Sequence, residues 1–233
     1  MIRNVKALGL ALVAIFAMSA MVASAAQAEN GVLDLSPGGG AGTKVTIKGN
    51  QVTNHSFTIA GVKVECSIVV FQPLGEYGTG ATSVEVHPVY EGCTSGIGTT
   101  IVNTENCNFT LMANGSANAN EEMLTWNTGE VKVTCNGSTF ITINAANVCV
   151  ATIATQTLSS GISFTNTTPN NTNEMAFDVI ANKAPVATVK NVDGFGCPFV
   201  GTGSTTGEYT GRTTMQCFEG SVIRVDCTIK TAP

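Results

Sequence analysis

Eight cysteines constrain the fold of this 233-residue chain more than any other feature. All of them lie beyond residue 60, and no two are closer than ten residues, so the chain has no CxxC motif. Zinc ribbons, thioredoxin-type redox sites and covalent haem attachment need closely spaced cysteines and are therefore disfavoured. An even number of widely spaced cysteines is typical of disulfide bonds formed in an oxidising compartment.

The start of the chain has the order of a secretory signal peptide. Arg3 and Lys6 precede an uncharged apolar stretch, and small residues follow it through Ala28. The apolar stretch is shorter than the ~20 residues that a membrane-spanning helix needs. This order predicts a signal peptide over residues 1–28, with cleavage after Ala25 as the alternative. We therefore expect a secreted, extracellular protein with no stable membrane insertion after cleavage.

The remainder of the chain is rich in β-branched residues. After residue 28, Val and Ile together number 34 against six Leu, and Thr reaches 32. Such residues fit a pleated sheet and lose rotamer freedom on a helix. The composition predicts an all-β fold of antiparallel strands, packed as a β-sandwich or closed as barrel-like sheets, and stabilised by disulfides.

Alternation of apolar and polar residues places the strands. The predicted strands cover residues 44–48, 62–66, 83–87, 99–103, 130–135, 140–144, 148–155, 176–180, 185–189, 209–215 and 222–229. Asn136-Gly137 separates two of these strands and is a hairpin turn signal. Residues 29–42 read as a flexible lead-in to a β-domain over 43–233. A division into two β-lobes near residues 113–129 is an alternative to one continuous core.

Strand geometry limits how the cysteines can pair. Cys93 and Cys107 flank one predicted strand, and Cys135 and Cys149 flank another. A strand holds its two ends farther apart than the 4.4–6.8 Å or so that a disulfide spans between Cα atoms. Pairing in sequence order avoids this conflict. It predicts the bridges Cys66–Cys93, Cys107–Cys135, Cys149–Cys197 and Cys217–Cys227, the last one at the base of a hairpin around residues 219–221.

Four segments carry a resemblance to known proteins. They are residues 7–17 of the leader, 86–93 ending at Cys93, 133–143 around Cys135, and 196–211. These segments resemble a group of uncharacterised, secreted, disulfide-containing β-proteins of high-GC Gram-positive soil bacteria. The resemblance covers most of residues 60–230 and implies a bacterial origin and a β-fold. It implies no activity, because the shared positions are Cys, Gly and Thr.

Chemical motifs are scarce in the chain. It has two histidines, His55 and His87, and no GxSxG, SxxK or HExxH motif, so we predict no catalytic, cofactor-binding or metal-binding residues. The eleven Lys and Arg residues include two in the leader, and the others are scattered against sixteen acidic residues. Nucleic acid is therefore an unsuitable partner. Trp126 and Tyr90 are weak candidates for ligand binding.

Three functional classes remain open. We expect that the protein is not an enzyme. We expect a secreted, disulfide-stabilised β-protein with a structural or surface-interaction role. Its partner would be a cell surface or an extracellular polymer. The alternatives are an extracellular carbohydrate- or ligand-binding module and a secreted hydrolase. An exposed row of Trp126 with a tyrosine would favour the module. A histidine in a cleft, beside a serine and an acid, would favour the hydrolase.

Overall fold

The structure of the protein is a computed structural model. It describes residues 31–35, 42–104, 107–117, 125–137, 140–146, 149–167, 176–191, 203–223 and 227–231. The predicted signal peptide lies outside these residues. Every regular element among the described residues is a β-strand, which confirms the all-β prediction. In the same ranges, no helix has the length and apolar character needed to cross a membrane.

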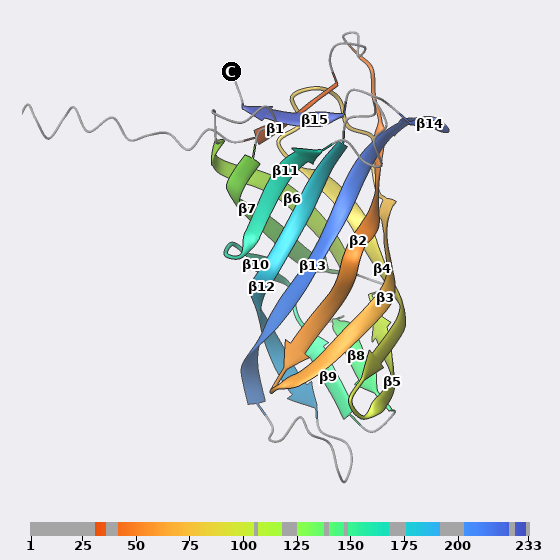
Figure 1. The fold of residues 1–233 in the computed structure, drawn as a ribbon, viewed down its shortest axis with the longest axis vertical. Helices are drawn as coiled ribbons and strands as arrows, with labels where there is room; N and C mark the ends of the chain where they lie inside the picture. The colour runs from red at the N-terminus through yellow and green to blue at the C-terminus, as the bar shows by residue number, and fades with distance from the viewer. Residues whose placement is uncertain are drawn as a thin grey trace, which may run out of the picture.

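The described residues form fifteen strands. Figure 1 shows their arrangement. They are β1 (Gly31–Asp34), β2 (Thr46–Ile59), β3 (Val62–Pro73), β4 (Val84–Ser95), β5 (Gly98–Asn103), β6 (Cys107–Ala117), β7 (Thr125–Cys135), β8 (Ile141–Ala145), β9 (Cys149–Ile153), β10 (Gln156–Leu158), β11 (Ile162–Thr167), β12 (Ala176–Asn191), β13 (Gly203–Glu219), β14 (Val222–Ile223) and β15 (Thr228–Thr231).

Thirteen of these strands form one antiparallel sheet that closes on itself. Strands β4, β3, β2, β13 and β12 pair in that order and form one side. The other side is split between two sets of shorter strands. In one half β6, β7 and β11 connect β4 back to β12, and in the other half β5, β8 and β9 do so (Figure 1). The barrel-like alternative of the fold prediction is the one observed.

Alternate residues of the strands point into the closed sheet. In β8, for example, Ile141, Ile143 and Ala145 are buried, whereas Thr142 and Asn144 between them are only half-buried. The inward-facing side chains of both halves belong to one hydrophobic core. Described strands on both sides of residues 113–129 therefore contribute to the same core.

The hairpin predicted at Asn136-Gly137 is wrong. Gly137 has a φ of 64°, as a turn residue can, but strands β7 and β8 on either side of it do not pair with each other. Both edges of β7 are occupied, by β6 on one side and by β10 and β11 on the other. The chain therefore passes from one half of the closed sheet to the other, where β8 pairs with β5 and β9.

Two further segments differ from the sequence predictions. The predicted strands 176–180 and 185–189 belong to one strand, β12, with an irregularity in its pairing to β13 between Ala181 and Ala184. The lead-in predicted as flexible over 29–42 contains a strand. Residues 31–34 form β1, which pairs with β15 and is largely buried. Because residues 31–34 are paired with β15 and largely buried, this part of the predicted lead-in is not a flexible linker.

Strands β1 and β15 form a separate ribbon at one end of the closed sheet (Figure 1). Leu33 of β1 and Ile229 of β15 are buried against the closed sheet. Backbone hydrogen bonds join Leu33 to Ala81 and to Gly80. Because β1 and β15 come from opposite ends of the described chain, the ribbon brings both ends together over the core.

Candidate functional site

The most chemically distinctive group of side chains lies inside the closed sheet, around His55. Its imidazole is 2% exposed and projects inward from β2. Gly211 of β13 faces the ring, and a Cβ atom at position 211 would lie only 2.5 Å from His55 Nδ1. The absence of a side chain at Gly211 therefore makes room for the imidazole.

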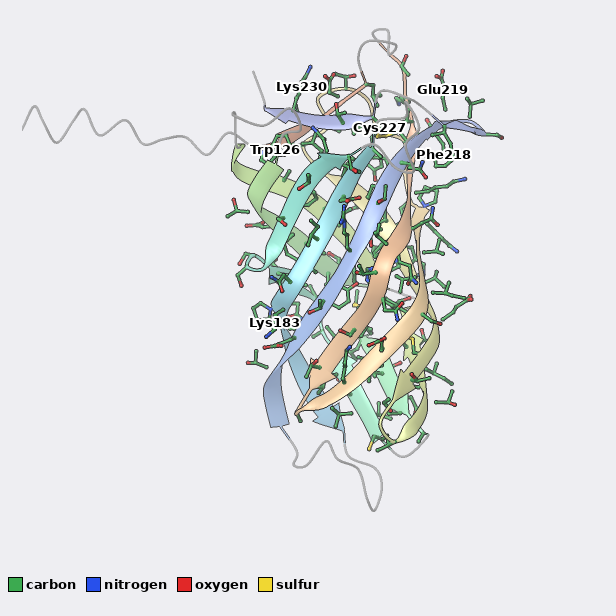
Figure 2. All side chains as sticks on the ribbon, viewed as in Figure 1. Trp126, Lys183, Phe218, Glu219, Cys227 and Lys230 are labelled. Atoms are coloured by element: carbon green, nitrogen blue, oxygen red, sulfur yellow. A yellow bond between two sulfur atoms is a disulfide. The ribbon has the colours of Figure 1, made fainter. Side chains whose placement is uncertain are left out.

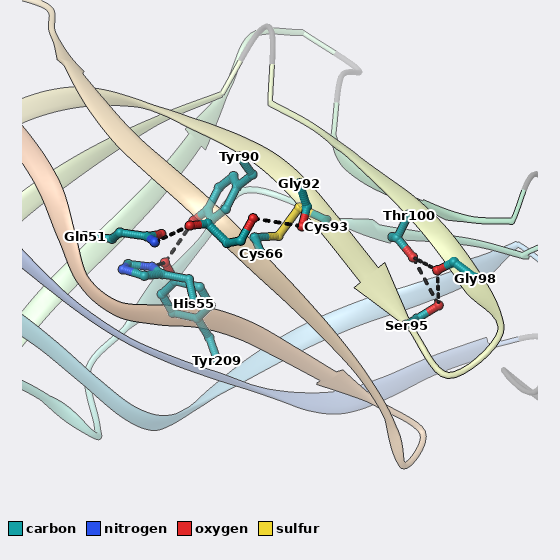
Figure 3. Close-up of a disulfide and its surroundings, with 11 residues drawn as sticks. Gln51, His55, Cys66, Tyr90, Gly92, Cys93, Ser95, Gly98, Thr100 and Tyr209 are labelled. Carbon is teal, nitrogen blue, oxygen red and sulfur yellow. Dashed lines mark hydrogen bonds between the residues drawn. A yellow bond between two sulfur atoms is a disulfide. The ribbon is translucent and has the colours of Figure 1, made fainter.

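A chain of hydrogen bonds runs through this group (Figure 3). The hydroxyl oxygens of Tyr90 and Tyr209 are 2.9 Å apart, and the Tyr209 hydroxyl is 2.5 Å from His55 Nδ1. On the other side of the ring, Nε2 is 3.1 Å from Thr213 Oγ1 and 3.3 Å from the carbonyl oxygen of Arg212. The carbonyl can only accept, so the assignment that satisfies the whole chain places the imidazole proton on Nε2. Nδ1 then accepts from Tyr209, which in turn accepts from Tyr90.

Burial controls the ionisation of this group. Burial lowers the pKa of His55 to about 4, although the hydrogen bond to the Arg212 carbonyl acts in the opposite direction. Burial also raises the pKa of Tyr90 well above its usual value and raises that of Tyr209. All three side chains are therefore neutral at pH 7, and the group is a network of neutral hydrogen bonds.

The space beside this network is too small for a substrate. A cavity of about 20 Å³ touches His55 and Tyr209, and its other walls are mostly apolar. A second cavity of about 20 Å³ lies beneath the β1–β15 ribbon, between Leu33 and Phe164. A volume of this size is enough for about one water molecule. The described side chains therefore leave no room for a substrate at these two places.

His87, the other candidate base, is on β4 and is half-buried. Its Nδ1 lies 3.1 Å from the carbonyl oxygen of Cys107 and 3.4 Å from Asn108 Oδ1. Neither His87 nor His55 has a serine or a carboxylate among its hydrogen-bond partners in the described part of the chain. In that part, too, no three His, Cys, Asp or Glu side chains gather closely enough to hold a metal ion.

The two residues proposed for ligand binding are both buried. Trp126 is fully buried beneath the ribbon end of the closed sheet (Figure 2). Tyr90 is 6% exposed. Trp126 Nε1 has no hydrogen-bond partner among the described residues. Tyr209 is buried as well, so these aromatic side chains form no exposed row. The exposed row of Trp126 with a tyrosine, which would favour a carbohydrate-binding module, is therefore not present among these residues.

The disulfides follow the predicted order where the structure describes both partners. Bridges join Cys66 to Cys93, Cys107 to Cys135, and Cys217 to Cys227, with Cα–Cα distances of 3.9, 4.0 and 5.7 Å. The first two connect residues that face each other on paired strands. The third connects β13 to the residue just before β15. Cys149 is also disulfide-bonded, but its predicted partner, Cys197, lies outside the described residues.

An ordered polar group lies on the outer face of the sheet. Phe177 and Val179 of β12 point into the core, so Asp178 between them points outward, yet its side chain is only 1% exposed. Arg212 Nε donates to Asp178 Oδ2 at 2.6 Å, and Thr214 Oγ1 donates to Oδ1 at 2.5 Å. The Arg212 side chain is 45% exposed. This pair presents a fixed guanidinium group to solvent.

The sequence indicated His55 and Tyr90 as candidate residues, but separately and for different functions. It did not indicate that Tyr209 joins them in one hydrogen-bonded group. One signal was present in the sequence. Tyr209, Gly211 and Thr213 follow one another at a spacing of two, so a strand places all three on one face. A glycine between two polar residues on such a face indicates that something approaches the backbone closely.

Comparisons with known proteins identify no relative. No family model matches the chain, and neither a curated protein nor a solved structure matches it significantly.

Proposed function

We propose that the protein is a secreted, disulfide-stabilised β-protein that acts through its outer surface, in a structural or surface-interaction role, and not as an enzyme. The observation that carries this proposal is the lack of room beside His55, inside the closed sheet. The cavity beside His55 has a volume of about 20 Å³, and both ring nitrogens of His55 are engaged by neighbouring groups. A substrate has no place to bind there, so the outer face is the surface that remains for a partner.

The disulfides support an extracellular setting for this role. Three described bridges tie together segments 10, 27 and 28 residues apart in the sequence. Such bridges form and persist in oxidising compartments, and each contributes roughly 2–4 kcal/mol to stability. The outer face carries exposed threonines, such as Thr53, Thr94 and Thr134. A partner class suited to such hydroxyl groups is an extracellular polymer with many hydroxyl groups of its own, such as a cell-wall polysaccharide.

A depletion experiment tests the proposal. The purified protein is mixed with insoluble peptidoglycan, chitin or cellulose, and the protein left in solution after sedimentation is measured. We expect at least one polymer to remove the protein from solution without being degraded. Release of soluble sugar or peptide from a polymer, abolished by His55→Gln or His87→Gln, would instead establish a hydrolase.

Two variants locate the contact. Val222 is 69% exposed on the short strand β14, and Ile101 is 59% exposed on β5 (Figure 1). The two lie at opposite ends of the closed sheet. Val222→Ser and Ile101→Ser therefore act as matched controls for each other. If the partner binds near one end, only the variant at that end should lose retention on the polymer.

A further inference from the structure

The regular pairing of the sheet is interrupted around His55. The pairing of β2 with β3 shifts between Asn50 and His55. The pairing of β2 with β13 shifts on both sides of Arg212. At this irregularity the imidazole Nε2 of His55 bonds the Arg212 carbonyl oxygen. The His55 side chain of β2 is therefore bonded to the backbone of β13 where the pairing of these two strands is irregular.

The hydrogen bonds of this region require a neutral imidazole. Tyr90 donates to Tyr209, Tyr209 donates to Nδ1 of His55, and Nε2 donates to the Arg212 carbonyl. A neutral imidazole has one donor and one acceptor nitrogen, as this order needs. A proton on Nδ1 would turn the acceptor into a donor. The Tyr209 hydroxyl would then have to reverse, and the hydroxyl proton of Tyr90 would lose its acceptor.

No charge of opposite sign compensates for such a proton. The ring faces Tyr209 and Thr213 of β13, Tyr90 of β4 and Phe71 of β3. The titratable groups among these neighbours are the two tyrosines, and among the described residues no carboxylate contacts the ring. An imidazolium ion would thus be buried without a counter-ion, which is costly.

We propose that His55 is an acid-sensitive latch, so that proton uptake at Nδ1 breaks the bond from Tyr209 and opens the closed sheet between β2 and β13. The proton comes from solvent and forms an N–H bond at Nδ1, and no covalent bond of the chain is broken. This property is independent of the role proposed for the outer surface.

The pH range follows from the ionisation of His55. Burial lowers its pKa from 6.5 to about 4 in the folded state. The unfolded chain therefore binds this proton first as the pH falls. The contribution of the neutral imidazole is fully present above pH 6.5 and is lost between pH 6.5 and about 4. Between pH 7.5 and 4.5, the unfolding equilibrium constant should rise about 70-fold through this group alone.

Urea unfolding of the full chain at pH 7.5, 6.0 and 4.5, followed by the fluorescence of buried Trp126, tests the latch. Wild type and the control His87→Gln should both show this rise of about 70-fold in the unfolding equilibrium constant, in addition to any change with pH that all variants share. His55→Gln cannot take up the proton and should lack that rise. Equal pH dependence in His55→Gln and wild type would overturn the proposal.

A second measurement does not depend on the folding of His55→Gln. The imidazole proton signals that remain in His87→Gln belong to His55, and NMR follows them with pH in the folded protein. We expect them to keep the shift of a neutral ring down to about pH 5, and amides of β2 and β13 to lose protection from exchange before those of β3 and β4. Protonation of folded His55 near pH 6.5, with those amides still protected, would contradict the latch.

Discussion

The side-chain amide of Asn166 bonds both backbone groups of Ile229. Asn166 Nδ2 donates to the Ile229 carbonyl oxygen at 2.7 Å, and Asn166 Oδ1 accepts from the Ile229 N–H at 2.8 Å. The amide of β11 thereby imitates a neighbouring strand along one edge of β15. Both residues are buried, so neither backbone group of Ile229 has water as a ready substitute.

Replacing Asn166 should loosen the ribbon that covers the core. Asn166→Ala leaves a buried donor and a buried acceptor unpaired, which should lower the free energy of unfolding by about 2–4 kcal/mol. Urea unfolding measures the loss, and Asn182→Ala is the control because Asn182 has an exposed side chain. Equal stability of Asn166→Ala and Asn182→Ala would show that this amide does not hold β15.

Gly211 should not tolerate a side chain. In Gly211→Ala the new Cβ would lie 2.5 Å from His55 Nδ1, and it would displace the imidazole from Tyr209. Such overpacking of a core typically costs about 1–3 kcal/mol. Gly96→Ala is the matched control, because a Cβ at position 96 meets no atom within 4 Å. The midpoint temperature of thermal unfolding should be lower for Gly211→Ala than for wild type, whereas that of Gly96→Ala should be close to the wild-type value.

Removing the Cys217–Cys227 bridge should loosen mainly β15. β15 pairs with β1 and not with β13, so this bridge is a covalent tie between β15 and the closed sheet. In the double variant Cys217→Ser, Cys227→Ser, stability should fall by at most about 3 kcal/mol, because the loop that the bridge closes is short. Hydrogen exchange should rise in β15 first.

The bridge at Cys66 and Cys93 provides the comparison. These two residues face each other on β3 and β4, whose backbone pairing continues on both sides of them. Replacing both with Ser should therefore leave exchange in β15 unchanged. Faster exchange in β15 for both double variants alike would mean that the ribbon has no special dependence on Cys217–Cys227.

The ion pair between Asp178 and Arg212, on the outer face of the sheet, should contribute to stability. Arg212→Ala would leave a nearly buried carboxylate with Thr214 as its remaining described partner. Because a buried charge without its counter-charge is unfavourable, we expect a loss of about 2 kcal/mol. Adding Asp178→Asn to this variant should recover part of the loss in urea unfolding. No recovery would mean that the carboxylate is adequately solvated in the absence of the arginine.

The strands could be predicted because their alternation reflects local burial. Residues such as Ile141 and Ile143 face the core in every arrangement that buries one face of the sheet. The segment around residues 50–54 shows the limit of this approach. Gln51 and Asn54 are polar, yet they lie within β2. Here β2 pairs with β13 at Gln51 and Thr53, and it pairs with β3 on either side of the segment.

Long-range relationships could not be predicted in the same way. Asn136-Gly137 correctly indicates a turn, but no local signal tells which strands pair, and here both edges of β7 were taken by others. His55 and Tyr209 are 154 residues apart in the sequence. Their contact depends on strand order around the closed sheet, which propensity and periodicity do not contain.

Retention of wild type and His55→Gln on the same insoluble polymer tests the central claim most directly. The claim is that the interior is filled and structural, and that a partner binds the outer face. At pH 7.5, with both proteins folded as judged by Trp126 fluorescence, we predict equal binding isotherms on a polymer that retains the wild type. A folded His55→Gln protein that no longer binds, or that loses a catalytic activity of the wild type, would contradict this account.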